Sequence, residues 1–366
     1  MINSKKISVF SLILIMYSVS AFFLTAQDVN NLLLRNYRPK SLYKIPVTQL
    51  QKAAFPVIDM HSHPYARSEK EISDWVRIMD SCGIQKTIIL SMATGAEFDS
   101  IMELYGKYGD RFEVWCGLDY TGYDTPDFPA SAVRELERCY KKGARGVGEL
   151  GDKGLGLFYS HPVPAWGMHI DDPRLKPVFQ KCAELHMPVN IHVADPVWMY
   201  EKMDSTNDGL MNAFEWKIDL SKPGILGLDQ LVQTLENAVR ENPKTIFIAC
   251  HFANLNHDLD RLGRMLDTYP NFYADISARY AESATIPRYM QNFYKKYQNR
   301  LLYGTDMGFS PSMYRVTFRI LETADEHFYE ISQFGYHWAL HGFALPRTVL
   351  KKIYNTNATR ILGKYK

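Results

Sequence analysis

The chain has 366 residues, with 42 basic and 40 acidic side chains, a net charge of +2 and 46% hydrophobic residues. This hydrophobic content provides a large core and excludes a disordered chain. The balanced charge, without a long Lys/Arg run, argues against nucleic acid as a partner. Five widely spaced cysteines without a CxxC motif exclude a disulfide framework and a cysteine-based zinc site.

Residues 1–26 have the pattern of a secretory signal peptide. Lys5 and Lys6 precede an apolar stretch from Ile7 to Leu24, and small and polar residues follow from Thr25. We therefore expect export, to the periplasm or out of the cell, without stable membrane insertion once the peptide is cleaved. A retained membrane anchor is the alternative.

Residues 27–54 are predicted to be a short N-terminal extension, and residues 55–366 one catalytic domain. Within that domain, eight short apolar runs read as strands that are buried on both faces. They cover residues 56–61, 86–91, 112–117, 144–149, 188–193, 245–251, 272–277 and 300–306.

Helical patterns fill the gaps between these runs. The clearest cover residues 71–82, 130–142, 174–186, 228–241 and 258–269. Eight strand–helix units predict an α/β fold, a single (β/α)8 TIM barrel, with an open doubly wound sheet as the alternative. Long connections are expected after the fifth strand, at 194–227, and after the eighth, at 307–346. Both follow strand C-termini, where the active sites of such barrels lie.

Histidine and aspartate residues fall at the C-terminal ends of the predicted strands. They are His61 and His63 at the end of the first strand, His192 at the end of the fifth, His251 at the end of the sixth and Asp306 at the end of the eighth. A closed barrel would bring all five to one mouth. Side chains two apart on a strand point the same way, so His61 and His63 are both able to bind one metal ion. Neutral imidazoles with a carboxylate suit Zn and similar divalent ions.

These motifs resemble the amidohydrolase superfamily, and within it the amidohydrolase-2 group of metal-dependent hydrolases and non-oxidative decarboxylases. The resemblance rests on residues 57–63 (VIDMHSH), 190–192 (NIH), 250–251 (CH), 303–306 (YGTD) and the ending 353–362. It implies that His61, His63, His192 and Asp306 are metal ligands. It also implies that Asp306 accepts a proton from the attacking water, and that His251 is an acid/base or polarising group.

Two departures from the group's pattern affect the predicted site. Phe252-Ala253-Asn254 follows His251, where small Gly-rich residues are common in the group. Glu149 ends the fourth predicted strand, where other branches place a carboxylate that bridges two metals. One ion, most simply Zn, is favoured, with Glu149 as an added ligand if there are two.

The expected activity is hydrolysis of an amide, lactone or ester bond in a small molecule by a metal-activated water. A metal-dependent decarboxylase is the alternative, and a barrel that binds metal or small molecules without catalysis is the third reading. Arg279 is a candidate for binding a substrate carboxylate or phosphate, and Trp198 for lining an apolar part of the pocket. A homo-oligomer is left open.

Overall fold

The computed structural model describes residues 29–158 and 163–363. The predicted signal peptide therefore lies outside the described residues. The chain divides into two compact units, residues 1–39 and residues 40–366. The described part of the first unit contains two short 3-10 turns, Val29–Asn31 and Leu34–Asn36, with no buried residues.

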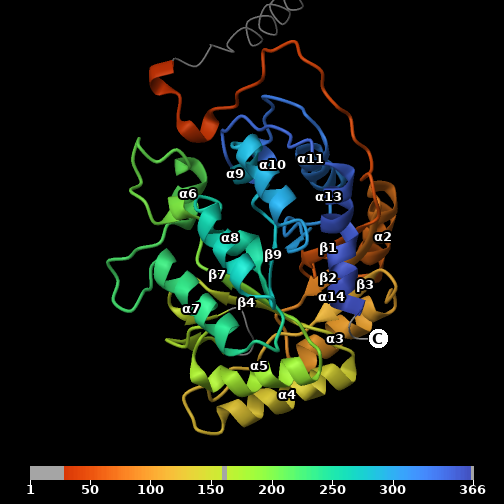
Figure 1. The fold of residues 1–366 in the computed structure, drawn as a ribbon, viewed down its shortest axis with the longest axis vertical. Coiled ribbons are helices and arrows are strands. Elements are labelled where there is room, and N and C mark those ends of the chain that lie inside the picture. The colour runs from red at the N-terminus through yellow and green to blue at the C-terminus, as the bar shows by residue number, and fades with distance from the viewer. Residues whose placement is uncertain (1–28, 159–162, 364–366) are drawn as a thin grey trace, which may run out of the picture. The chain divides into compact units, whose positions relative to one another are not determined.

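Eight parallel strands form the centre of the second unit (Figure 1). They are β1 (Val57–Ser62), β2 (Ile84–Leu90), β3 (Phe112–Trp115), β4 (Val147–Asp152), β7 (Val189–Val193), β8 (Phe247–Ala249), β9 (Phe272–Asp275) and β10 (Leu301–Leu302). Each of the eight predicted strands overlaps one of them. Two short antiparallel strands, β5 (Gly156–Leu157) and β6 (Ala165–Trp166), follow β4 and were not predicted.

The parallel strands form two sheets, one in the order β1-β2-β3 and one in the order β10-β9-β8-β7-β4. Backbone hydrogen bonds connect the sheets at both pairs of edges. Cys116, just after β3, pairs with Val147 of β4. At the other seam, Met60 N donates to Tyr303 O at 2.9 Å and Thr305 N donates to His61 O at 3.1 Å. The strand order and both seams are those that a barrel requires.

Helices surround the strands (Figure 1). They are α2 (Glu69–Cys82), α3 (Gly95–Gly106), α4 (Phe128–Lys142), α5 (Lys176–Glu184), α6 (Leu210–Trp216), α7 (Leu228–Glu241), α8 (Leu259–Thr268), α9 (Tyr280–Ala284), α10 (Pro287–Lys296), α11 (Pro311–Glu322), α12 (Ile331–Phe334), α13 (Arg347–Lys351) and α14 (Asn357–Gly363). All five predicted helices are present, within a few residues at their ends. The expected long connection after the eighth strand contains α11, whose start is set by the Ser310 side chain capping Met313 N and by Pro311.

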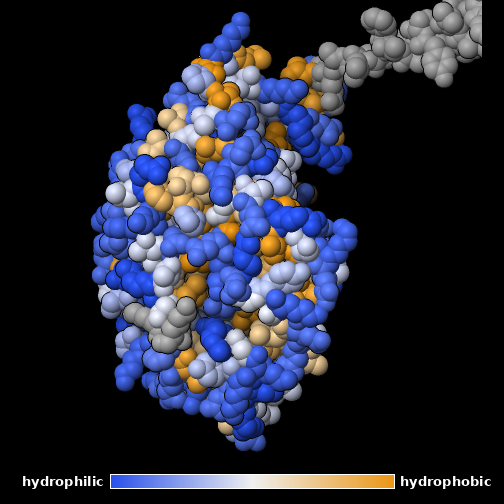
Figure 2. All heavy atoms as spheres, turned by 90° about the vertical axis from the view of Figure 1, so that its right-hand side faces the viewer, coloured by the Kyte–Doolittle hydropathy of each residue, from blue (hydrophilic) through white to orange (hydrophobic). Residues whose placement is uncertain are grey.

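The buried apolar side chains form two layers. Alternate residues of the strands, such as Ile58, Met60, Ile88 and Leu302, pack together on the inner side, while their neighbours pack against the helices. The side chains on the face drawn in Figure 2 are mostly hydrophilic, with hydrophobic ones scattered between them. No helix among the described residues is both long and apolar enough to cross a membrane.

The C-terminal helix α14 is tied to the strands by one buried polar side chain. Asn357 Nδ2 donates to the backbone carbonyls of Gln298 and Leu301, each at 2.8 Å. Ala358 and Ile361 of the same helix pack into the inner layer. This helix therefore fixes the segment that enters β10, the strand that precedes Asp306.

Three strand ends differ from the prediction in ways that affect the site. β4 runs to Asp152, because Gly151 and Asp152 pair with His192 and Val193, so Glu149 lies within the strand and not at its end. β8 ends at Ala249, because His251 and the next residues adopt left-handed backbone angles. Asp306, with φ 58°, likewise lies in a turn beyond β10.

Candidate metal centre

Six of the singled-out side chains meet at the C-terminal ends of the strands: His61, His63, Glu149, His192, His251 and Asp306. Two carboxylates lie among four imidazoles. His63 Nε2 is 3.2 Å from Glu149 Oε2 and 3.0 Å from Asp306 Oδ1. His251 Nε2 is 3.7 Å from Glu149 Oε1 and 3.7 Å from Asp306 Oδ2. The cluster has the donor types and the closeness of a divalent metal site.

His61 presents to this cluster a nitrogen that has no hydrogen-bond partner. Its Nδ1 lies 2.9 Å from Asp275 Oδ2, and an ionised carboxylate only accepts, so the ring proton belongs on Nδ1. Its Nε2 is buried and has no hydrogen-bond partner. A buried polar atom left in this way needs an explanation, and a metal ion bound at Nε2 provides one.

His63 and His251 are oriented in the same way. His63 Nδ1 is 2.9 Å from Leu90 O, and His251 Nδ1 is 2.9 Å from Ser277 O. Because a carbonyl oxygen only accepts, each Nδ1 carries a proton, and Nε2 is the nitrogen that faces the two carboxylates and would bind a metal ion. Outer hydrogen bonds of this kind orient metal-binding histidines.

His192 uses its other nitrogen. Its Nε2 lies 2.9 Å from Ala194 O, and its Nδ1 faces Glu149 Oε1 at 2.6 Å. The carbonyl of Ala194 only accepts, so Nε2 carries a proton and donates to it. Nδ1, which now contacts the Glu149 carboxylate, is the nitrogen that would bind a metal ion in place of that contact.

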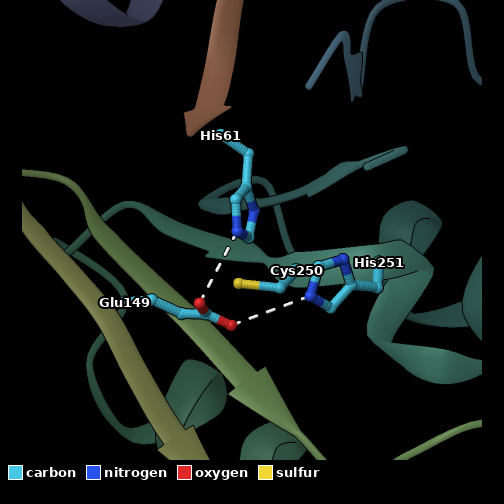
Figure 3. Close-up of side chains that lie close together, drawn as sticks. All are labelled: His61, Glu149, Cys250 and His251. Atoms are coloured by element: carbon cyan, nitrogen blue, oxygen red, sulfur yellow. Dashed lines mark ion pairs between the residues drawn. The ribbon is translucent and has the colours of Figure 1, made fainter. Parts of the chain in front are cut away.

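The Glu149 carboxylate lies between the two pairs of imidazoles. Its Oε2 faces His61 at 3.6 Å and His63 at 3.2 Å, and its Oε1 faces His192 at 2.6 Å and His251 at 3.7 Å. Figure 3 shows the carboxylate with one oxygen toward His61 and the other toward His251. The two oxygens of one buried carboxylate thus point at separate groups of nitrogen donors.

Cys250 also lies within this cluster (Figure 3). Its Sγ donates to Asn190 Oδ1 at 2.8 Å, while Asn190 Nδ2 donates to Asp275. Because the amide nitrogen of Asn190 donates to the Asp275 carboxylate, the amide oxygen is the atom that faces the sulfur. This arrangement keeps Cys250 a protonated thiol beside the histidines.

Burial and the neighbouring charges shift the pKa values of several cluster residues in opposite directions. Burial by itself would raise the pKa of Glu149 and of Asp306, but the surrounding histidines hold both pKa values below their ordinary range. Burial would lower the pKa of His63, but its bonds to Asp306 and Glu149 raise it to about 10. Burial lowers the pKa of His251 to about 4, so this imidazole is neutral.

Metal binding should therefore release protons. Without metal, His63 has a pKa of about 10 and His61 a pKa well above its ordinary value, so both are protonated at neutral pH and must lose a proton to bind a cation. We expect Zn²⁺ to release about two protons per chain at pH 7, and its affinity to rise with pH between 6 and 8. Calorimetric titration in buffers of different ionisation enthalpy measures this number. A binding heat that does not depend on the buffer would contradict the assignment of these ligands.

The backbone around the cluster is unusual in two places. Residues 251–254 all have positive φ, so this left-handed turn is built without the Gly-rich residues that are common after this histidine in the group. Such conformations cost of order 1–3 kcal/mol per residue and collect at functional sites. At Gly304, a Cβ atom would lie 2.7 Å from His61 Cβ, so glycine is required where the chain passes His61.

Two fully buried aspartates support the cluster and were not predicted. Asp59 accepts from Thr305 N at 3.0 Å and from Thr305 Oγ1 at 2.7 Å, which fixes the turn that carries Asp306. Asp275, at the end of β9, contacts His61 and the backbone of His251. The sequence does contain a signal for both residues: an Asp within an apolar strand needs a buried polar partner. The partners, however, come from other strands.

A cavity of about 420 Å³ opens onto the cluster. Besides cluster residues, its lining includes Lys153, Asp195, Trp216, Arg279 and Tyr336. Arg279 is held by Asn254, with Nε 2.9 Å from Asn254 Oδ1, so the structure brings this predicted residue to the cavity.

The second predicted substrate residue, Trp198, is not among the described residues that line the cavity. Its ring packs against Trp338, with centroids 5.2 Å apart, and against Tyr336. Tyr336, Trp216 and Phe334 are described aromatic residues that line the cavity, and Trp198 contacts one of them, Tyr336.

The comparison with protein families decides the identity of this domain. A family model described as Amidohydrolase matches residues 58–364. The chain belongs to the amidohydrolase-2 family. This membership and the donor set at the cluster together support a divalent metal. Among curated proteins, none matches the chain.

Solved structures with the same fold include an inferred amidohydrolase from Staphylococcus aureus, at 15% identity and a TM-score of 0.54, covering 84% of this chain and 99% of that one. A dihydroxybenzoic acid decarboxylase from Polaromonas sp. JS666, with bound manganese, matches at 16% identity and a TM-score of 0.52, covering 85% and 98%. A 5-carboxyvanillate decarboxylase from Novosphingobium aromaticivorans, complexed with manganese, matches at 15% identity and a TM-score of 0.52, covering 87% and 100%. At these identities the likeness shows the shared fold alone.

Proposed function

We propose that this amidohydrolase is an exported hydrolase that acts through two divalent ions, held at the mouth of a closed (β/α)8 barrel and bridged by Glu149. The observation that carries the proposal is the position of Glu149, whose Oε2 faces His63 at 3.2 Å and whose Oε1 faces His192 at 2.6 Å. A single ion would need the histidines on only one side of the Glu149 carboxylate. The proposal thus replaces the one-ion site that the sequence favoured.

We assign the ligands to two ions, although His251 lies near both sets, with Nε2 3.7 Å from Asp306 Oδ2 as well as from Glu149 Oε1. His61, His63 and Asp306 would hold the first with Glu149 Oε2, since these three offer ligand atoms within 4.8 Å of one another. His192 and His251 would hold the second with Glu149 Oε1. His251 fits a ligand better than an acid, because its Nε2 carries a lone pair and its pKa is lowered to about 4. Zn²⁺ and Mn²⁺ both suit a set of imidazoles and carboxylates.

Bound divalent ions would polarise a substrate carbonyl and bring the pKa of a water molecule toward about 7. The chain's own residues supply the rest. Asp306, within reach of His63 on one oxygen and of His251 on the other, accepts the proton of the attacking water and returns it to the leaving nitrogen or oxygen. Arg279 binds an acidic group of the substrate at the cavity wall, where its guanidinium is fixed by Asn254.

The substrate is proposed to be a small molecule with a carboxylate and a hydrolysable amide, ester or lactone bond. The cavity of about 420 Å³ holds a molecule of that size. Arg279 on its wall is the cation proposed to bind an acidic group, whereas Lys153 pairs with Asp195 at 2.9 Å. The rings of Trp216 and Tyr336 offer flat apolar contact. Export rests on the sequence of residues 1–26 alone.

Decarboxylation of an aromatic acid is the second candidate. It is favoured by Arg279 beside the cluster, which suits a carboxylate substrate, and by the manganese-containing decarboxylases of the same fold. In that reaction one ion would suffice to orient the substrate. The bridging position of Glu149 is the reason to rank hydrolysis first.

A parallel assay separates the two activities. Metal-free protein, reloaded with Zn²⁺ or Mn²⁺, is incubated with carboxylate-bearing lactones, esters and amides, with their uncharged analogues, and with hydroxybenzoates. We expect hydrolysis that depends on added metal and favours the acidic substrates, without release of CO₂. Metal-dependent CO₂ release without any hydrolysis would replace the proposal with the second candidate.

A further inference from the structure

One buried carboxylate contacts two of the metal-facing histidines at once. Asp275 lies at the end of β9, a strand that carries none of the six cluster residues, and its side chain is fully buried. We propose that Asp275, acting with Ser277, is a positioning residue that holds His61 and His251 with their Nε2 lone pairs toward the metals. This inference rests on the proposed metal centre.

The contacts of Asp275 divide between its two oxygens. Oδ2 lies 2.9 Å from His61 Nδ1 and 3.2 Å from Asn190 Nδ2. Oδ1 accepts from the backbone N–H groups of His251, at 3.0 Å, and Ser277, at 3.1 Å, and from Ser277 Oγ at 2.5 Å. Amide groups of the backbone cannot exchange donor for acceptor, so Oδ1 must remain an acceptor.

Ser277 extends this control to the second histidine. Its hydroxyl has one proton, which the 2.5 Å contact assigns to Asp275 Oδ1. Toward His61 Nδ1, at 3.0 Å, and His251 Nδ1, at 2.8 Å, the same oxygen can then only accept. Both rings must carry a proton on Nδ1, so Nε2 is the nitrogen through which each ring would bind a metal ion. Asp275 therefore sets the tautomer of two ligands that would bind opposite sides of Glu149.

Replacing Asp275 with Asn should remove one contact in particular, the acceptor that faces His61 Nδ1. The amide oxygen must take the place of Oδ1, because three donors point at that position. The amide NH₂ then faces His61 Nδ1, so His61 is driven to carry its proton on Nε2, the atom that has to bind metal. Loss of such an outer partner costs about 10- to 100-fold in metal affinity.

The test compares metal affinity in Asp275→Asn, Asp152→Asn and wild-type protein by competition with a chelating dye, using Zn²⁺ as the probe. Asp152 is a matched control: it is equally buried, holds His169 Nδ1 at 2.6 Å and accepts from two backbone N–H groups, but is outside the metal cluster. We expect Zn²⁺ affinity to fall about 10- to 100-fold in Asp275→Asn and to stay within about threefold of wild type in Asp152→Asn. Equal affinities in all three proteins, or equal losses in both variants, would overturn the inference.

A second measurement needs no variant. In Zn²⁺-loaded wild-type protein with ¹⁵N-labelled histidine, NMR should show His61 and His251 each with a proton on Nδ1 and metal at Nε2. Metal bound through Nδ1 of either ring would overturn the role of Asp275 even if the variants do not fold. Wild-type protein that binds no Zn²⁺ would instead reject the proposed centre itself, so the two failures are distinguishable.

Discussion

Replacing Asp306 with Asn should lower kcat by at least about 100-fold, the usual scale for the loss of a positioned base, while most of the bound metal remains. Asn keeps the shape of the side chain and one oxygen that can face His63, but it accepts no proton. The turn that carries it should persist, because Asp59 binds the backbone and hydroxyl of Thr305, and Tyr65 Oη donates to the backbone carbonyl of residue 306.

Steady-state kinetics on the best substrate of the hydrolysis screen, joined to elemental analysis, checks this expectation. Asp152→Asn serves as the control for the loss of a buried carboxylate outside the cluster, and should keep the wild-type kcat. An Asp306→Asn enzyme that turns over near the wild-type rate with full metal content would show that another group accepts the proton.

Replacing both His61 and His63 with Ala should abolish metal binding. The two imidazoles supply the nitrogen donors that face Glu149 Oε2, at 3.6 and 3.2 Å. Without them, the buried Glu149 and the partly exposed Asp306 remain as two carboxylates with fewer cationic partners. We expect at least about a 100-fold loss of metal affinity, and activity at background even at high metal concentration.

Equilibrium dialysis against Zn²⁺ measures this loss, and circular dichroism checks that the variant is folded. His186→Ala, which removes an exposed histidine outside the cluster, should bind metal like the wild type. Near-stoichiometric, tight metal in the double variant would disprove the assignment of these two residues.

The sequence predicted the parts of the fold that local pattern determines. Apolar runs such as 188–193 and 272–277 identified their strands, because strands buried on both faces have few polar positions. Helices such as α4 and α7 followed from their periodicity. The ends of β8 and β10 did not follow, since the left-handed angles at His251 and Asp306 depend on contacts with other strands, such as that of Asp275 with the His251 backbone.

For the candidate site, the sequence likewise predicted which residues take part but not how their side chains are oriented. The His-x-His motif and its companions identified which side chains meet, because the C-terminal ends of parallel strands lie on the same side of the fold. The orientation of each ring was not predictable, since it depends on hydrogen bonds to Leu90 O, Ser277 O and Ala194 O. These are backbone carbonyls, which every residue type has, so the sequence does not show which of them will contact a ring. For the same reason Glu149 remained an optional ligand until its two oxygens could be seen to face different histidines.

The number of metal ions per chain tests the central claim most directly. Wild-type protein saturated with Zn²⁺ or Mn²⁺ and then freed of loose metal should contain about two ions by elemental analysis, and Glu149→Gln should contain about one, because an amide bridges two cations poorly. Two ions in the wild type and a loss of one in Glu149→Gln are the predicted results. One ion in both proteins would contradict the bridged centre, and none in either would contradict a metal-dependent hydrolase.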